Sequence, residues 1–260
     1  MAFEKGFHGR TSAAVAITDN PSIIAPVNSG HEVIFLPLND LTRVEETLKN
    51  GDIAAVIIEG IQGIGGIIVP DPDFLKQLEL VCRRYGTVLI LDEIQSGYGR
   101  SGKFFAYQHT DVVPDIVTVA KGMGNGFPVG GVLISSMFKP KYGMLGTTFG
   151  GNYLACAASL AVLEVIEAEK LIDNAREIGN YWLKSLANIP GISDLRGMGL
   201  MIGLEFEKNI QDIRKQLLME KCIFTGVSGT RVIRLLPPLT LKMKQAEGFV
   251  AHLLDVANSS

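Results

Sequence analysis

Short runs of apolar, often β-branched residues alternate with helical patterns through the first half of the chain. The clearest strand-like runs are residues 53–58, 88–91, 116–120 and 129–135. These runs do not alternate between polar and apolar residues, as a strand with one solvent-exposed face does. They are therefore typical of strands that are covered on both faces of the sheet. Helical patterns between strands are typical of parallel sheets, because parallel strands need long crossover connections. We therefore expect an α/β fold with a mostly parallel sheet.

Helix signals support this alternation and then change in character. Asp40 and Asp71 stand where N-caps are expected, before helical patterns at 41–49 and 72–85, and Pro72 suits a first helical turn. A further strand is expected at 32–38. The later part predicts long helices and a small α+β region, with helices at 155–169, 172–187, 210–221 and 242–257 and strands at 192–196, 200–206, 222–225 and 232–235. We expect a large domain over residues 1–175 and a small C-terminal α+β domain over 176–260.

Composition narrows the function classes. The chain has 260 residues, 47% of them hydrophobic, and a net charge of −3, which indicates a globular protein without a basic surface for nucleic acid. No apolar run is long enough for a transmembrane helix. Cys82, Cys156 and Cys222 each lie in apolar surroundings, which predicts buried free thiols and a cytoplasmic protein. The histidines show no metal-ligand spacing, so no metal is expected.

Two charged residues follow buried strands, and they indicate chemistry. Lys121 ends the 116–120 run and precedes a glycine-rich loop, while Asp92 and Glu93 end the 88–91 run. If these runs are neighbouring parallel strands, an acid and an amine share the sheet edge where open α/β sheets bind ligands. A lysine there can form a Schiff base with an aldehyde, and an acid can hold a pyridinium nitrogen. A lysine that reaches solvent and an acid that caps a turn remain the plainer alternatives.

Neighbouring residues add to this interpretation. Residues 146–152 place the hydroxyls of Thr147 and Thr148 among glycines just before a helix, which suits an anion such as phosphate. Gln95 is placed to contact a ring oxygen of a cofactor. Glu93 is expected on the opposite face from Asp92 if the strand pleat persists.

Seven segments, in order, resemble those of one enzyme family. They are Phe-His-Gly-Arg-Thr at 7–11, Gly-Ile-Gln-Gly at 60–63, Leu-Asp-Glu-Ile-Gln-Ser-Gly-Tyr-Gly-Arg-Ser-Gly at 91–102, Ala-Lys-Gly at 120–122 with Gly-Phe-Pro at 126–128, Thr-Thr-Phe-Gly-Gly-Asn at 147–152, Arg-Gly-Met-Gly-Leu at 196–200 and Arg-Leu-Leu-Pro-Pro-Leu at 234–239. This set resembles the class III (ornithine-type) pyridoxal-phosphate-dependent aminotransferases. The first and sixth segments most resemble acetylornithine or succinylornithine aminotransferases. The resemblance implies fold type I of the pyridoxal-phosphate enzymes.

The resemblance also implies roles for single residues. Lys121 is the expected catalytic residue, which forms the Schiff base with pyridoxal 5'-phosphate and moves the proton. Asp92 pairs with the ring nitrogen, and Thr148 reaches the phosphate of the neighbouring subunit. The full cofactor-binding set is Phe7, Asp92, Glu93, Ile94, Gln95, Lys121 and Thr148. The full substrate-binding set, with two arginines for carboxylates, is Arg10, Glu59, Thr147 and Arg234.

The expected reaction is transfer of the ω-amino group of N-acetylornithine or N-succinylornithine to 2-oxoglutarate, which gives a semialdehyde and glutamate in arginine biosynthesis. A homodimer with a shared active site is implied. Ornithine δ-aminotransferase and 4-aminobutyrate aminotransferase are alternatives with the same cofactor machinery.

The sequence departs from the family pattern at its start and in one loop. Relatives carry a further segment before the Phe-His-Gly-Arg residues, so we expect a large domain that lacks its N-terminal part and exposes apolar surface. An inactive structural fragment without cofactor is therefore an alternative of another class. Ile64 stands where relatives often have an acid that pairs with the small-domain arginine, and Gly60 stands where many have proline.

Overall fold

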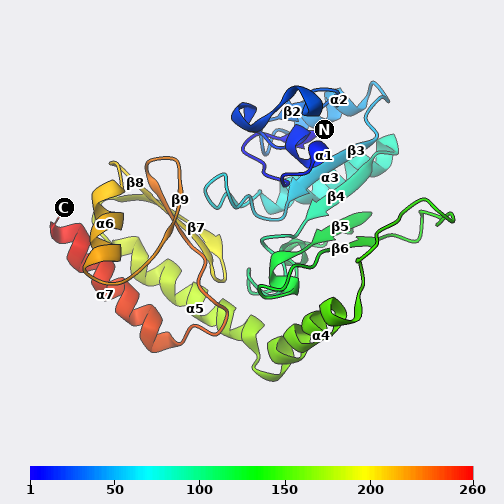
Figure 1. The fold of residues 1–260 in the computed structure, drawn as a ribbon. Helices are drawn as coiled ribbons and strands as arrows, with labels where there is room; N and C mark the ends of the chain where they lie inside the picture. Colours follow the sequence, from blue (N-terminus) through cyan, green and yellow to red (C-terminus); the bar gives the residue numbers. More distant parts are fainter. Residues whose placement is uncertain (260) are drawn as a thin grey trace.

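A mostly parallel sheet forms the centre of the large lobe. The computed structural model describes residues 1–259 (Figure 1). Strands β3 (Ala55–Glu59), β4 (Val88–Asp92) and β5 (Ile116–Val119) are parallel neighbours, and β6 (Gly131–Ile134) runs antiparallel along the outer side of β5. The predicted mostly parallel sheet is confirmed, and β4 and β5 are neighbours as the site hypothesis requires.

A short pair of strands extends this sheet on its other side. Strand β1 (Ala2–Phe3) pairs in parallel with β2 (Phe35–Leu36). The amide of Ile57 also donates to the carbonyl of Met1 at 3.1 Å, which places β1 beside β3. The strand expected at 32–38 is therefore much shorter than predicted, because only its middle bonds to a neighbour.

Two helices cover the large sheet as predicted. Helix α2 (Leu41–Leu48) begins after Asp40, whose carboxylate accepts from the amide of Arg43 at 3.1 Å. Helix α3 (Pro72–Tyr85) begins after Asp71 and ends at Gly86, whose φ of 67° suits a glycine. Both helices pack into one core cluster, formed by Phe3, Leu36, Val44, Leu48, Val56, Ile58, Phe74, Leu75, Leu78, Val81, Cys82, Leu89, Leu91 and Val112.

Two long helices lead from the large lobe to the small one (Figure 1). Helix α4 (Tyr153–Ala168) begins at an Asn152 cap, and α5 (Leu171–Ser185) follows a break at Lys170, whose φ is 52°. Apart from the α-helices of the small lobe, the other helical pieces of residues 1–259 are short: α1 (Ser12–Ala16) and the 3-10 turns Pro21–Ile23, Pro26–Asn28, Ala106–His109, Lys121–Met123 and Leu186–Asn188.

The small lobe is an antiparallel sheet with helices on one face. Its strand order is β7-β8-β10-β9, and the bounds are Ile192–Met198 for β7, Met201–Phe206 for β8, Gly226–Ser228 for β9 and Val232–Leu235 for β10. Helices α5, α6 (Gln211–Met219) and α7 (Met243–Ser259) share its core cluster. The strand expected at 222–225 is wrong: Cys222 has a φ of 55°, outside the extended region, and the strand begins only at Gly226.

The cysteine prediction holds only in part. All three thiols are free and Cys82 is buried, but Cys156 and Cys222 are exposed. Cys156 lies on α4, which also exposes Tyr153 (95%) and Leu160 (56%). The apolar residues next to Cys156 in the sequence therefore form an exposed face of α4 and do not bury the thiol. Burial raises the pKa of the Cys82 thiol to about 12, so this thiol is inert at neutral pH.

Residues 1–259 contain neither a membrane-spanning helix nor a cluster of metal ligands. None of the helices there is long and apolar enough to cross a lipid bilayer. No group of His, Cys, Asp and Glu side chains there is arranged to hold a metal ion.

Candidate active site

Three charged residues meet at the carboxyl edge of the large sheet. Glu59 and Asp92 are the last residues of β3 and β4 and lie opposite each other in register. Asp92 in turn pairs with Thr118 of β5, and Lys121 follows two residues after that strand ends. Parallel strands therefore bring two acids and one amine to the edge where ligands bind in open α/β sheets.

Asp92 is buried and held from two sides. Its Oδ2 lies 2.8 Å from Nδ1 of His8, and the two side chains are 4% and 2% exposed. Its Oδ1 accepts from the amide of Ile94 at 3.1 Å. Sequence reasoning missed His8, although it lies beside Phe7 in a segment already linked to the site. The two residues are 84 positions apart in the sequence, so no local pattern predicts their contact.

Lys121 adopts an uncommon backbone conformation beside these acids. Its φ is 42°, in the left-handed region, and it begins a 3-10 turn. Non-glycine residues in this region often mark functional sites. Desolvation lowers the pKa of Lys121, against the negative charges of Asp92 and Glu59, which raise it. Within residues 1–259 its Nζ has no hydrogen-bond or ion-pair partner, so the amine is available.

Glu59 fixes the loop around this edge. Its Oε1 accepts from the amide of Phe7 and its Oε2 from the amide of Gly63, both at 2.9 Å. Burial raises the pKa of Glu59 to about 7, and the two amide bonds reduce that rise. Both oxygens are thus committed to main-chain donors.

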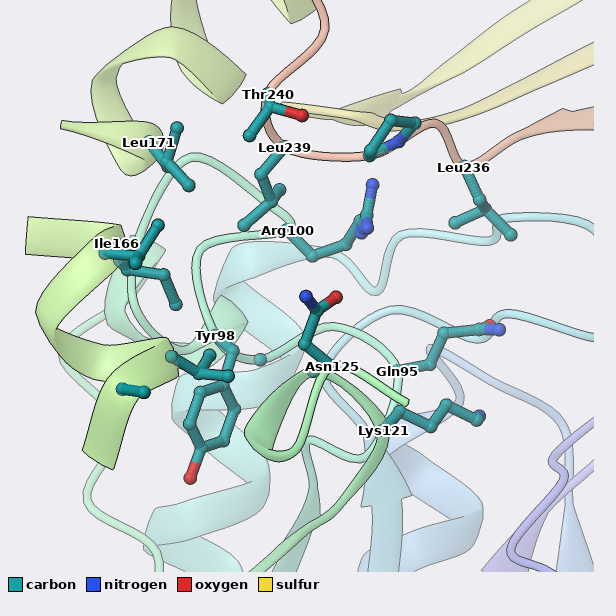
Figure 2. A pocket seen from close by; sticks show the side chains of 16 residues that line it. Gln95, Tyr98, Arg100, Lys121, Asn125, Ile166, Leu171, Leu236, Leu239 and Thr240 are labelled. Atoms are coloured by element: carbon teal, nitrogen blue, oxygen red, sulfur yellow. The ribbon is translucent and has the colours of Figure 1, made fainter. Parts of the chain in front are cut away.

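The residues after Asp92 divide between two faces. Glu93 is fully buried, and its oxygens accept from Ser96 Oγ at 2.6 Å and from the amides of Ala106 and Tyr107 at 2.9 Å. Its carboxylate therefore organises the following loop. The half-buried Gln95 lies over Gly63, where an added Cβ would stand 1.3 Å from the Gln95 Oε1 atom. Figure 2 shows the Gln95 and Lys121 side chains extending in the same direction.

The two predicted carboxylate-binding arginines occupy different settings. Arg10 is exposed, and its guanidinium carbon lies 5.8 Å from the centre of the Phe7 ring, within cation–π range. Arg234, on β10, donates from Nη1 to the carbonyl of Gly63 at 3.1 Å and from Nε to the carbonyl of Val227 at 3.0 Å. Desolvation lowers the pKa of Arg234, whereas the charge of Glu59 raises it.

Arg234 belongs to a joint between the lobes. Three side chains of the small lobe bond to carbonyls of the 60–66 loop: Arg234 to Gly63, Ser228 to Ile64 at 2.8 Å and Arg196 to Gly66 at 3.0 Å. Arg196 is neutralised by Asp194 and by Glu205, the latter at 2.8 Å. Arg234 has no such acidic partner within residues 1–259. Two arginines in one joint therefore differ in whether their charge is paired.

The structure does not bring every predicted residue to Lys121. Thr147 and Thr148 are exposed and lie in the segment between β6 and α4, which projects from the rest of the chain (Figure 1). The Thr147 Oγ1 atom accepts from the amide of Gly150 at 3.1 Å. This segment is therefore far from the sheet edge of its own chain.

A cavity of about 530 Å³ adjoins the site (Figure 2). Gln95, Arg100, Lys121 and Asn125 provide polar groups, while α4 provides an apolar wall. The Arg100 guanidinium donates to the carbonyls of Leu200, at 3.3 Å, and Pro237. Burial lowers the pKa of Arg100 to about 10. The cavity therefore lies between the lobes, next to the amine.

Comparison with known proteins gives a consistent result. Residues 1–256 match the family described as Aminotransferase class-III. Among curated proteins, the acetylornithine aminotransferases of Aquifex aeolicus and Methanocaldococcus jannaschii are 37% and 40% identical over 98% of this chain, which covers 68% and 66% of their lengths. Among solved structures, ornithine aminotransferase from Toxoplasma gondii matches with a TM-score of 0.90 and 30% identity, over 99% of this chain and 64% of that one. The chain thus spans about two thirds of the length of these relatives.

Proposed function

The chain belongs to the class III aminotransferases, and we propose that its protein transfers the ω-amino group of N-acetylornithine or N-succinylornithine to 2-oxoglutarate. The products are the semialdehyde and glutamate, and the pathway is arginine biosynthesis. The observation that carries the proposal is the buried Asp92–His8 pair beside the amine of Lys121, which has no partner within residues 1–259. The names of the relatives at 37–40% identity support the choice of donor.

The class uses pyridoxal 5'-phosphate, and the residues present fit that group. A buried carboxylate, an available amine and the half-buried ring of Phe7 are the groups that a protonated pyridine aldehyde requires. When bound, the cofactor supplies an electron sink and carries the amino group between substrates. The residues of the chain then orient the cofactor and the substrates, and they move protons.

Each predicted residue receives a role on this basis. Lys121 would take the proton from the reacting carbon of the donor and pass it to the C4′ carbon of the cofactor, because desolvation lowers the pKa of its amine. Asp92, oriented by His8, keeps the ring nitrogen protonated. Phe7 covers one face of the cofactor ring. Ile94 packs beside that ring, and Gln95 contacts the ring oxygen.

The substrate residues act at the two ends of a dicarboxylate. Arg10 and Arg234 bind carboxylates, since a guanidinium fork matches both oxygens. Glu59 positions the amides of Phe7 and Gly63 and so shapes the substrate side. Glu93 supports the cofactor indirectly, by holding the loop after Asp92.

A homodimer is part of the proposal. In it, Thr147 and Thr148 of one chain reach the phosphate and substrate at the other chain's site. The support is an exposed apolar surface around the projecting segment and the start of α4: Leu145 is 79% exposed, Phe149 80% and Leu154 66%. Patches of this kind mark protein interfaces.

Two further points are proposed. Residues 1–175 and 176–260 form separate domains, because Leu171 of α5 packs in a large-lobe cluster while Ile178 of the same helix packs in the small-lobe core. The free thiols support a cytoplasmic location.

A cofactor titration tests the central assignment. Pyridoxal 5'-phosphate added to the chain should give a visible absorption band that Lys121→Ala removes, with Lys139→Ala as a control because Lys139 lies on an exposed loop. A chain without such a band is the structural fragment and not an enzyme. Turnover with N-acetylornithine, N-succinylornithine, ornithine and 4-aminobutyrate then identifies the donor.

A further inference from the structure

A buried hydroxyl at the sheet edge lacks a partner within residues 1–259. In this part of the chain, three buried side-chain atoms accept or donate no hydrogen bond: Gln62 Oε1, Ser159 Oγ and Thr118 Oγ1. The Gln62 amide is already held through Nε2, which donates to the carbonyl of Glu4 at 2.9 Å. Ser159 lies on α4, where a small rotation lets a hydroxyl bond to a carbonyl of the preceding turn. Thr118 has no such turn behind it, because it lies in strand β5.

The neighbours of Thr118 in the sheet leave its hydroxyl unsatisfied. Its register partners are Asp92 on β4 and Val132 on β6. The oxygens of Asp92 already have partners in His8 and the amide of Ile94. The side chain of Val132 is apolar and offers no acceptor. Paired residues of neighbouring strands point to the same face of a sheet, so the hydroxyl lies on the face of Asp92.

The main chain fixes this hydroxyl beside the site. The carbonyl of Thr118 accepts from the amide of Glu93 at 3.0 Å, so the residue is held to the segment that carries Asp92. A buried hydroxyl without a partner carries a free-energy cost, and an incoming acceptor removes it. A ligand that brings such an acceptor therefore gains affinity at Thr118.

The roles proposed for Asp92 and Gln95 decide which part of the cofactor lies nearest Thr118. In the cofactor ring the nitrogen is opposite the aldehyde-bearing carbon, and the ring oxygen and the phosphate arm stand on opposite sides of the line between them. Gln95 lies over Gly63, in the loop after β3. Thr118 lies on the other side of Asp92, on β5. With the nitrogen at Asp92 and the ring oxygen at Gln95, the phosphate arm falls on the side of Thr118.

We propose that the Thr118 hydroxyl donates a hydrogen bond to the phosphate of the bound cofactor. This inference rests on the proposed function, because it requires pyridoxal 5'-phosphate at Asp92. A phosphate oxygen is an anionic acceptor, so the bond is charge-assisted and stronger than one between neutral groups. The donor is in place before the cofactor binds, because its strand already holds it.

Thr118→Val tests this role, since it removes the hydroxyl and keeps the shape of the side chain. In the cofactor-free chain it should raise the Tm by about 2–4 °C, because no buried hydroxyl is then left unsatisfied. The same variant should weaken pyridoxal 5'-phosphate binding about tenfold, measured as the Kd in an absorbance titration. A threonine that only supports the fold would lower the Tm when replaced.

A second variant and a second probe provide the controls. Thr118→Ser keeps the hydroxyl and loses only a methyl group, so it should retain the native Kd for pyridoxal 5'-phosphate. Pyridoxal has the same ring without the phosphate. The native chain and Thr118→Val should therefore bind pyridoxal with equal Kd.

The outcomes separate this inference from the proposed function. Equal pyridoxal 5'-phosphate affinities of the native chain and Thr118→Val overturn the inference, and so does an equal loss with pyridoxal, which would place the hydroxyl at the ring. If the Lys121-dependent band is present in either case, the proposed function stands. A lower Tm for cofactor-free Thr118→Val also overturns the inference, because the hydroxyl then has a partner without the cofactor. A native chain that binds no pyridoxal 5'-phosphate refutes the proposed function, and the inference fails with it.

Discussion

Replacing His8 by alanine should both destabilise the chain and weaken its cofactor binding. The substitution removes the Nδ1 atom that lies 2.8 Å from Oδ2 of Asp92. Within residues 1–259 this oxygen has no second partner, because the amide of Ile94 bonds to Oδ1. At 4% exposure the carboxylate cannot regain its bond from bulk water.

The expected loss follows from that geometry. A buried acceptor left without a donor costs about 1–3 kcal/mol, and a charged acceptor costs more. For a protein of this size each kcal/mol lowers the Tm by about 2–4 °C. Asp92 also loses the contact that orients it toward the cofactor. Each ~1.4 kcal/mol of binding free energy lost in this way weakens cofactor affinity about tenfold.

His8→Asn is the matched variant, since its Nδ2 group can donate from nearly the same position as Nδ1. Thermal unfolding measures stability, and absorbance titration with pyridoxal 5'-phosphate measures affinity per folded chain. His8→Asn should recover most of both losses. If His8→Ala lowers the Tm but leaves the affinity unchanged, His8 is only a packing residue and its assigned role in orienting Asp92 is wrong.

Two more predictions concern stability. The pKa of Glu59 is about 7, above its ordinary 4.5, so the folded state holds the proton longer than the unfolded state and the free energy of unfolding falls as pH rises between these values. The fall is roughly 3 kcal/mol, and denaturant unfolding of Glu59→Gln across this pH range should show a flatter profile; an equal slope in both proteins would exclude Glu59 as the cause. Gly199→Ala should destabilise far more than Gly229→Ala: both have left-handed φ values, 54° and 56°, but an added Cβ at 199 would lie 2.5 Å from the Ser101 carbonyl carbon, while at 229 it would meet nothing within 4 Å. The backbone strain that both variants share costs about 1–2 kcal/mol. If denaturant unfolding shows equal losses of stability for the two variants, the main chain around Ser101 moves aside at little cost and the predicted clash is wrong.

Local signals predicted much of the large lobe. The Asp40 and Asp71 caps determine where two helices begin, and the apolar runs identify β3, β4 and β5. The meeting of Asp92 and Lys121 could be predicted because both follow runs that must lie in one parallel sheet. These features depend on spacing and side-chain type, which a single sequence contains.

Features that depend on distant partners were harder to predict. His8 contacts Asp92 across 84 positions, and nothing in its neighbours specifies that partner. The exposure of Cys156 depends on which face of α4 is covered, and α4 is apolar on several faces. The strand predicted at Cys222 is wrong because the backbone of this residue is left-handed. An apolar run of residues does not indicate such a backbone conformation.

The joint between the lobes has a consequence for how this protein can change. The small lobe holds the 60–66 loop through the carbonyls of Gly63, Ile64 and Gly66, and every residue type supplies a carbonyl. Substitutions at position 64 therefore alter what the loop presents to a ligand without loosening its attachment. The side chains of this loop can therefore change in evolution while the hydrogen bonds that connect the two lobes are retained.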